Sequence, residues 1–480
     1  MACLLGHSLG GIAAIKPIRP VDRTPSPMSG LALRRRARAW LQEENLRRLL
    51  RNAGYLAGGN AAAYPLDLIA LALTARVLGP EQFGILVLIQ AYVRTLQRLL
   101  TFQSWQAIIR FGSGALERRG AGEFQSLIKF GLLLDVATAL SACVVGLLGL
   151  QVAARWFDWS SETVTMASVL CLALPFSLGD TPTAILRLFD RFNLLAYRQV
   201  ATSAVRFVLA LSGFLAGAGL WFFILVAIVV RILEPMLGLV AAWRELRRQG
   251  FAGVLRAPLK GLMQRFPGIW GFAWSTNITS SIRMSTQEVD TLLVGGLVDA
   301  TAAGLYHVAK RMVRVALQLA VNVQQAVYPD VAKLWAKGAT RQFGTIVQRT
   351  NLLMGAMGCC ALLMVIVGAQ QIIIWTVGAD FRDASLFLIL QMLAGTIMLF
   401  GIALQPALMS MGLQRRVLQI TFGATALFHV LLLTSVPWSG PLGASLAHVA
   451  FSAVWVTAML LAMQDGLKRH EKGATRGGVA

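Results

Sequence analysis

The sequence predicts an all-α integral membrane fold with 12 transmembrane helices in two six-helix bundles. The first observation behind this prediction is composition: 56% of the 480 residues are hydrophobic, and the mean hydropathy is +0.64. The second is that the apolar residues form long runs, more than a soluble domain of this length needs. The third is the position of the basic residues, which give a formal net charge of +22 and fall between those runs.

Twelve segments are apolar over about 20 residues or more, which is the length that a helix needs to cross a bilayer. Pro175 and Pro182 interrupt the fourth of them, where they serve either helix packing or a hinge. The segments are expected at 53–76, 83–109, 126–152, 163–186, 195–216, 220–243, 268–295, 303–328, 351–376, 384–411, 417–436 and 441–463.

Basic residues gather in every second connection between these segments. Both termini and the long connection 244–267 belong to this basic set, whereas the other set holds mainly Asp and Glu, such as Glu81, Asp158 and Asp299. Because cytoplasmic loops of membrane proteins are enriched in Lys and Arg, the basic set and both termini are expected in the cytoplasm. This pattern explains the net charge through membrane topology and anionic membrane lipids, so we exclude a nucleic-acid partner.

The connection 244–267 is the longest basic gap between segments, and it follows the sixth of them. It divides the chain into two halves of six helices each, with a basic tail at either end. The expected domains are an N-terminal tail 1–51, a bundle 52–243, a linker 244–267, a bundle 268–463 and a C-terminal tail 464–480.

A weak internal repeat supports the two halves. A shift of 220 residues places Gly84 on Gly304 and Arg94 on Arg314. Six helices separate the two copies, and since this number is even, both copies enter the membrane in the same direction. The halves are therefore expected to be parallel repeats, related by an axis along the membrane normal.

Polar residues form a stripe along two of the predicted helices. Their spacing of mostly three or four residues places them on one helix face. Arg314 falls near the middle of a span, where a cation costs about 2.5–3.5 kcal/mol on insertion scales, so it is expected to face protein or water. The stripe in 304–330 consists of His307, Lys310, Arg311, Arg314, Gln318, Asn322 and Gln325, and that in the second span of Gln90, Arg94, Gln97, Arg98 and Thr101.

The arginines of these stripes are candidates for binding a phosphorylated substrate. Arg94, Arg98, Arg311 and Arg314 are expected to face a cavity between the halves, and Lys310 is a further candidate in the same stripe. A guanidinium group donates two parallel hydrogen bonds to a phosphate, and opposed clusters in a cleft of low dielectric constant would attract a diphosphate. The alternative is that these arginines hold helices together through carbonyl groups and acidic partners.

Acidic residues within the spans are candidates for ion coupling. Asp67 could carry a proton or coordinate a cation, or it could neutralise a neighbouring arginine. Asp290 lies nearer the outer end of its span, where it is expected to cap or to pair. Arg231 and Glu234 are three residues apart in the sixth span and are expected to pair with each other. Asp135 has no partner that the sequence identifies.

Other chemistry has no support in the sequence. The five cysteines and five histidines show no zinc-binding spacing, and no phosphate-binding loop, HExxH motif or nucleophile elbow occurs. ATPase and protease activities are therefore excluded, and no cofactor or metal is expected.

Three segments resemble the bacterial polysaccharide-repeat-unit flippases, which transport precursors of O-antigen and exopolysaccharide. They are ARVLGPEQFGIL at Ala75–Leu86, AILRLFDRFNLL at Ala184–Leu195 and DTLLVGGLVDATAAGLYHVA at Asp290–Ala309. Together with the spans, the resemblance covers roughly residues 50–463. That family is one of a superfamily that also holds the multidrug-and-toxin extruders and the lipid II flippases. The lipid II branch typically has two further spans, for which no room remains after residue 463.

The resemblance implies two bundles that form a V and open alternately to each side of the membrane. The implied substrate is an oligosaccharide on undecaprenyl diphosphate, moved from the inner to the outer leaflet of the bacterial cytoplasmic membrane. The resemblance assigns the diphosphate to cations of the cavity, here Arg94, Arg98, Arg311, Arg314 and also Arg283. Polysaccharide assembly proteins and membrane lipids would be its partners, and coupling to a proton or sodium ion stays open.

Three alternative functions would each need sequence features that differ from those predicted here. A multidrug antiporter of the same architecture should have an acidic, aromatic cavity for cationic drugs, whereas this cavity is predicted to be basic. A membrane glycosyltransferase or polymerase would need large outer loops, and the outer connections here span only about 3–10 residues. A non-transporting interaction protein would fit if the arginines were purely structural.

Overall fold

The computed structural model describes residues 44–117 and 121–477, apart from a few stretches of side chains, chiefly 278–287. The chain divides into a short unit, Met1–Arg51, and a large unit, Asn52–Ala480. Within the described ranges the chain forms α-helices and short 3-10 helices, with no strand.

The first half of the large unit contains the helices up to α8. Their bounds are α2 Glu44–Leu100, α3 Ser104–Glu117, α4 Ala121–Trp156, α5 Ser161–Cys171, η1 Leu174–Phe176, α6 Asp180–Leu188, α7 Phe192–Leu215 and α8 Leu220–Arg248. The connection to the second half carries two short elements, η2 Val254–Arg256 and α9 Leu262–Arg265. The second half has α10 Ile269–Leu297, α11 Ala300–Ala336, α12 Thr340–Thr376, η3 Ala379–Phe381, α13 Ala384–Phe400, α14 Leu404–Ser410, α15 Gln414–Ser439 and α16 Pro441–Gly477.

All twelve predicted spans are helical, so the predicted fold class is confirmed. The first two spans meet within α2 at Gly79, whose φ of 69° is favourable for glycine, and Pro80 then begins the next helical run. Nine helical segments among the described residues are long and apolar enough to cross a membrane. α10 and α11 are not among these nine, and α11 carries the polar stripe of the second half.

The fourth span is broken into α5, η1 and α6, with Pro175 in η1 and Pro182 in the first turn of α6. A buried carboxylate stabilises the break: Asp135 accepts hydrogen bonds from Ser104 Oγ at 2.6 Å and from the backbone N–H of Thr181 at 2.9 Å. The second bond satisfies an N–H at the start of α6, which has no partner within the helix. These contacts supply the partners that the sequence did not identify for Asp135.

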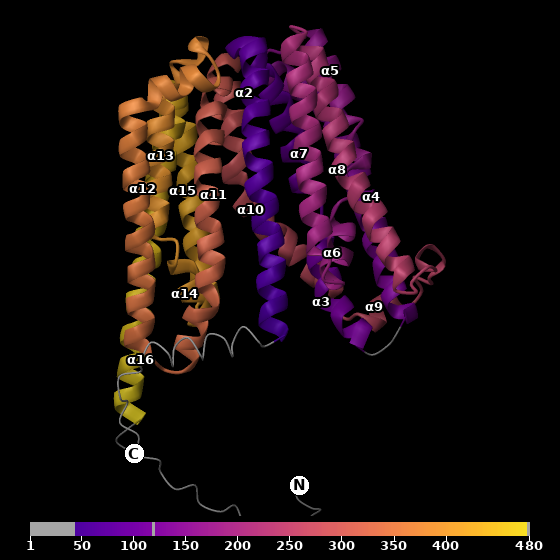
Figure 1. Ribbon diagram of the computed structural model, residues 1–480, viewed down its shortest axis with the longest axis vertical. Coiled ribbons are helices and arrows are strands. Elements are labelled where there is room, and N and C mark those ends of the chain that lie inside the picture. Colours follow the sequence, from indigo (N-terminus) through magenta and orange to yellow (C-terminus); the bar gives the residue numbers. More distant parts are fainter. Residues whose placement is uncertain (1–43, 118–120, 478–480) are drawn as a thin grey trace, which may run out of the picture. The chain divides into compact units, whose positions relative to one another are not determined.

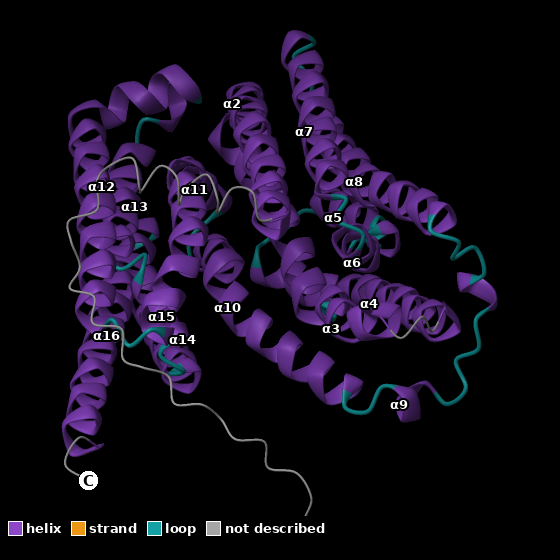
Figure 2. Cartoon of the chain, turned by 60° about the horizontal axis from the view of Figure 1, so that its bottom comes forward, coloured by secondary structure: helices purple, strands orange, loops and turns teal. Residues whose placement is uncertain are grey.

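The helices of each half pack mainly on one another. Contacts join α3 to α4 and α6, and α7 to α8, while α13 contacts α11, α12 and α16, and α15 contacts α10 and α16. Figure 1 shows α12, α13, α15 and α16 on one side of the large unit and α4 to α8 on the other, with α2, α10 and α11 between them. Figure 2 shows the connection from α8 through α9 to α10. The exact domain bounds stay a prediction.

Two glycines bring the halves into contact. A Cβ atom on Gly84 would lie 1.8 Å from the carbonyl oxygen of Ala300, and one on Gly304 would lie 2.8 Å from the carbonyl oxygen of Pro80 and 3.1 Å from Gly84 Cα. The backbones therefore touch here, as small residues allow between membrane helices. Gly84 and Gly304 are also the two glycines that the 220-residue repeat aligns. Beside them, an apolar core includes Phe83, Val308 and residues of both halves.

We expect the substitution Gly84→Ala to destabilise the protein, because its methyl group would collide with the Ala300 carbonyl. Overpacking of this kind typically costs about 1–3 kcal/mol. The matched control is Gly423→Ala in α15, where a Cβ atom meets nothing within 4 Å and the loss of chain flexibility should stabilise the helix slightly. Melting temperatures in detergent compare the two, and equal stability would show that the contact at Gly84 can relax freely.

Candidate functional site

A cavity of about 610 Å³ lies where α2, α7 and α8 meet α10 and α11. Both halves contribute charged side chains to its wall. Among the side chains that the structure describes, six arginines and four carboxylates line it, which gives a formal surplus of two positive charges. They are Arg94, Arg98, Arg206, Arg231, Arg311 and Arg314, and Asp67, Asp180, Glu234 and Glu288.

The structure places four predicted arginines in the wall of this one cavity. α2 supplies Arg94 and Arg98, which are four residues apart, and α11 supplies Arg311 and Arg314, which are three apart. This spacing places each pair on one helix face, as the sequence analysis assumed. Their role as ligands of a substrate stays a prediction.

The other two predicted cations do not add to this group in the described structure. Lys310 is turned away from the cavity into the second half, where its ammonium group contacts Asp290. Lys310 lies at the edge of the α11 face that carries Arg311 and Arg314, and its ammonium group is held by Asp290 of the second half. The placement of Lys310 at the cavity is therefore corrected. Arg283 lies among the side chains outside the described part of the structure.

An ion pair between Arg94 and Glu288 joins the two halves across the cavity. Arg94 Nε donates to Glu288 Oε2 at 3.0 Å, and Arg94 Nη1 donates to Gln90 Oε1 at 3.0 Å. The Glu288 side chain is only 8% exposed. Glu288 was missed in the sequence, although an ionisable residue inside a predicted span is a sufficient signal for a candidate site.

Asp67 lies between two arginines of different helices. Arg206 Nη1 of α7 donates to Asp67 Oδ1 at 2.6 Å, and Arg311 Nη2 of α11 lies 3.7 Å from Asp67 Oδ2. This is the geometry of an acid that neutralises neighbouring arginines, the second alternative for Asp67. Arg206 was missed in the sequence, where its position inside the fifth span marks it in the same way as Glu288.

The expected pair of Arg231 with Glu234 is wrong. Arg231 Nη1 donates to Gln97 Oε1 on α2 at 2.6 Å, and Glu234 Oε1 lies 3.8 Å from Arg198 Nη2 on α7. Both α8 side chains line the cavity, where partners on other helices are within reach. The pairing therefore links α8 to its neighbours instead of closing within the helix.

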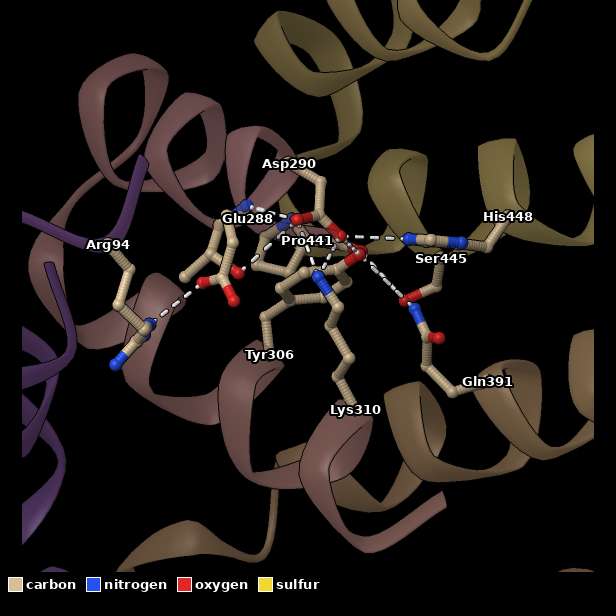
Figure 3. Close-up of polar contacts among 10 residues, drawn as sticks. Arg94, Glu288, Asp290, Tyr306, Lys310, Gln391, Pro441, Ser445 and His448 are labelled. Atoms are coloured by element: carbon tan, nitrogen blue, oxygen red, sulfur yellow. Dashed lines mark hydrogen bonds and ion pairs between the residues drawn. The ribbon is translucent and has the colours of Figure 1, made fainter. Parts of the chain in front are cut away.

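A second polar cluster surrounds Asp290, whose carboxylate is fully buried in the second half (Figure 3). Lys310 Nζ lies 2.5 Å from both carboxylate oxygens of Asp290. Tyr306 OH donates to Asp290 Oδ2 at 2.7 Å, His448 Nε2 lies 2.8 Å from the same oxygen, and Gln391 Nε2 donates to Tyr306 OH at 3.3 Å. The cluster connects α10, α11, α13 and α16, so Asp290 pairs, as expected, with a partner on another helix.

A family match over the first half of the chain and part of the second shows which family this protein belongs to. Residues 49–335, more than half of the chain, match the family described as "Polysaccharide biosynthesis protein". The chain belongs to the polysaccharide biosynthesis protein family. The family resemblance that the three sequence segments indicated is thereby confirmed.

A relative and two solved structures agree with this membership in the polysaccharide biosynthesis protein family. The inner membrane protein YghQ of Escherichia coli strain K12 is 28% identical over 355 residues, which are 72% of this chain and 97% of that protein. An inward-facing multidrug resistance MATE family transporter of the MOP superfamily has a TM-score of 0.68 at 13% identity, over 87% of this chain and 96% of that one. The lipid II flippase MurJ in an inward closed conformation has a TM-score of 0.66 at 14% identity, over 86% and 89%.

The solved structures, at such low identity, show the shared fold alone. Combined with the family match and the apolar helices, they make this polysaccharide biosynthesis protein a multi-pass membrane protein with that fold. The arginine-lined cavity is the feature of that fold which points to a particular kind of cargo.

We expect Lys310→Met to destabilise the protein strongly, because it leaves the Asp290 carboxylate buried without its counter-ion. Breaking a buried ion pair from one side typically costs about 3–5 kcal/mol. The double variant Lys310→Met with Asp290→Asn removes both charges and should recover most of the loss. Thermal unfolding in detergent measures both effects.

Arg416→Ala serves as the control for that experiment, because its partner Asp465 is half exposed and their ion pair is solvated. Its melting temperature should stay near that of the wild type. A single Lys310→Met variant as stable as this control would contradict a tight pair at Asp290.

Proposed function

We propose that the protein is a flippase for undecaprenyl-diphosphate-linked oligosaccharide repeat units. In this proposal it moves them from the inner to the outer leaflet of the bacterial cytoplasmic membrane, for surface polysaccharide assembly. The observation that carries the proposal is the single cavity with six arginines from both halves and a formal surplus of two positive charges. The family to which the chain belongs supports the same class of cargo.

The cavity provides hydrogen-bond donors and positive charge, which a diphosphate head group lacks in the hydrocarbon of a membrane. Moving a charged head group through hydrocarbon is prohibitive, because nothing there replaces its hydration. Guanidinium groups do replace it, since each donates several hydrogen bonds in a plane that suits phosphate oxygens. The volume of about 610 Å³ lies within the usual range for small-molecule sites, roughly 300–1,000 Å³. The polyprenyl tail would stay in the lipid while the head group occupies the cavity.

The direction of transport follows from the proposed orientation, with both termini and the basic connections in the cytoplasm. A membrane potential that is negative inside then favours outward movement of the anion, by roughly 2.3 kcal/mol per charge per 100 mV. Of the two acids proposed for coupling to a proton or sodium ion, Asp67 lines the cavity, whereas Asp290 does not. Asp290 lies outside the cavity with Lys310 at both oxygens, so we assign coupling to Asp67, where a proton or sodium ion must compete with Arg206 and Arg311 for the carboxylate.

The same observations disfavour multidrug antiport. A cationic drug in this cavity would face six arginines, and each of the four carboxylates there has a cationic or polar group as its neighbour. Membrane lipids and polysaccharide assembly proteins are the further partners in this proposal.

We expect Arg98→Gln and Arg314→Gln each to reduce translocation of lipid-linked oligosaccharide on the order of 10- to 100-fold, the usual value of one hydrogen bond to a charged group. Both side chains line the cavity, and glutamine keeps a polar side chain while removing the charge. The measurement is transfer between leaflets in proteoliposomes that contain the purified protein.

Arg248→Ala is the matched control, since this exposed arginine ends α8 outside the cavity. Its transport rate should equal that of the wild type. The proposal fails if the wild type moves no lipid-linked oligosaccharide, or if both cavity variants transport as fast as the control.

A further inference from the structure

The four carboxylates of the cavity are unexpected in a site that we assign to an anion. Glu288 is the least exposed of those whose ion pairs are described, at 8%, and it holds an arginine of the opposite half. An incoming diphosphate would compete with this carboxylate for the same guanidinium group.

We propose that Glu288 is an internal competitor of the substrate. In the empty protein its carboxylate occupies Arg94, a diphosphate displaces it from there, and the displacement breaks a link between the two halves. This inference rests on the proposed function, because it takes the diphosphate as the competing anion.

The hydrogen bonds of Arg94 show what the competition involves. The Nε–H group donates to Glu288 at 3.0 Å and one N–H of Nη1 donates to Gln90 at 3.0 Å, so two of the five donors of the guanidinium group are engaged. The side of the fork that includes Nε–H is blocked while Glu288 is in place. A phosphate that binds this side in a bidentate manner must therefore replace the carboxylate.

A diphosphate can compensate for this exchange because it has two phosphate groups. The first replaces Glu288 at Arg94, and the second can reach Arg98, four residues further along the same face of α2, or the arginines of α11. An anion with one such group only exchanges one partner of Arg94 for another.

A second link between the halves has the reverse polarity. Asp67 of α2 lies 3.7 Å from Arg311 of α11, whereas Glu288 of α10 pairs with Arg94 of α2. The 220-residue shift places Asp67 on residue 287, next to Glu288. Each half thus offers one acid and one arginine to the other. Asp67 has its shorter contact, 2.6 Å, with Arg206 of its own half, so Glu288 forms the principal link.

Release of Glu288 therefore connects binding to movement. While the carboxylate holds Arg94, α2 and α10 are tied together across the cavity. Once a diphosphate occupies Arg94, that tie is absent and the halves can separate more easily. The competitor also weakens binding, which favours release of the cargo on the other side.

Glu234 provides the matched control. It lines the same cavity and carries the same charge, but its partner at 3.8 Å is Arg198 of the first half, and 46% of its side chain is exposed. Glu234→Gln therefore changes the cavity charge by the same amount as Glu288→Gln and leaves both the Arg94 pair and the link between the halves in place.

The experiment measures binding of farnesyl diphosphate, a soluble polyprenyl diphosphate, to the purified full chain by calorimetry, together with translocation of lipid-linked oligosaccharide in proteoliposomes. For Glu288→Gln we expect affinity to rise on the order of tenfold, with a lower half-saturating concentration and a lower maximal rate of transport. Glu234→Gln should change both the affinity and the maximal rate much less than Glu288→Gln does. Glu288→Asp keeps the charge and should stay nearer the wild type in both measurements.

Unchanged affinity in Glu288→Gln, or an equal gain in Glu234→Gln, would overturn the competitor role. If the wild type binds and translocates normally in that case, the proposed function stands and only this inference fails. If the wild type neither binds farnesyl diphosphate nor translocates, the proposed function fails and takes this inference with it. Melting temperatures of all three variants show whether each is folded, and the Asp variant still tests the inference if Glu288→Gln is not.

Discussion

The cavity depends on one constraint, which is that an arginine inside a membrane protein needs partners for its charge and its hydrogen bonds. In this structure many of those partners lie on other helices. Arg94 reaches Glu288, Arg206 reaches Asp67, and Arg231 reaches Gln97. Each contact satisfies a cation and also ties two helices together, so the binding and structural interpretations of these arginines are not exclusive. The same side chains can hold the cavity together when it is empty and bind an anion when one enters.

The two polar clusters of the protein differ in how completely their charges are balanced. Around Asp290 the carboxylate has contacts from Lys310, Tyr306 and His448, and no part of it is exposed. Such a network makes the second half rigid and leaves little room for a ligand. The cavity wall instead combines opposite charges with a positive surplus and about 610 Å³ of space. This contrast separates a structural cluster from a binding site, although both use the same residue types.

The fold could be predicted because its signals are local. Apolar length marks each span, and a spacing of three or four residues was enough to place Arg94 and Arg98, or Arg311 and Arg314, on one face. The wrong or missing predictions concern the direction in which a side chain points and the residue that it binds. Lys310 belongs to the stripe by its spacing, but its ammonium group binds Asp290 on α10, a partner that helix periodicity does not indicate. The partners of Arg231 and Arg94 lie on helices far away in sequence, and no local pattern indicates which helix that is.

The contact between Gly84 and Gly304 concerns the symmetry of the molecule. Where two repeats are related by a two-fold axis, a residue that touches its own counterpart lies on that axis. If the two halves are such repeats, as the 220-residue shift predicts, the axis passes between these two backbones, which approach closely enough to exclude any side chain. In a dimer of two identical six-helix chains, this contact would join one glycine to its own copy, and a single substitution would act on both sides at once. In the present single chain each glycine can vary alone, but neither can become larger unless the other half moves away.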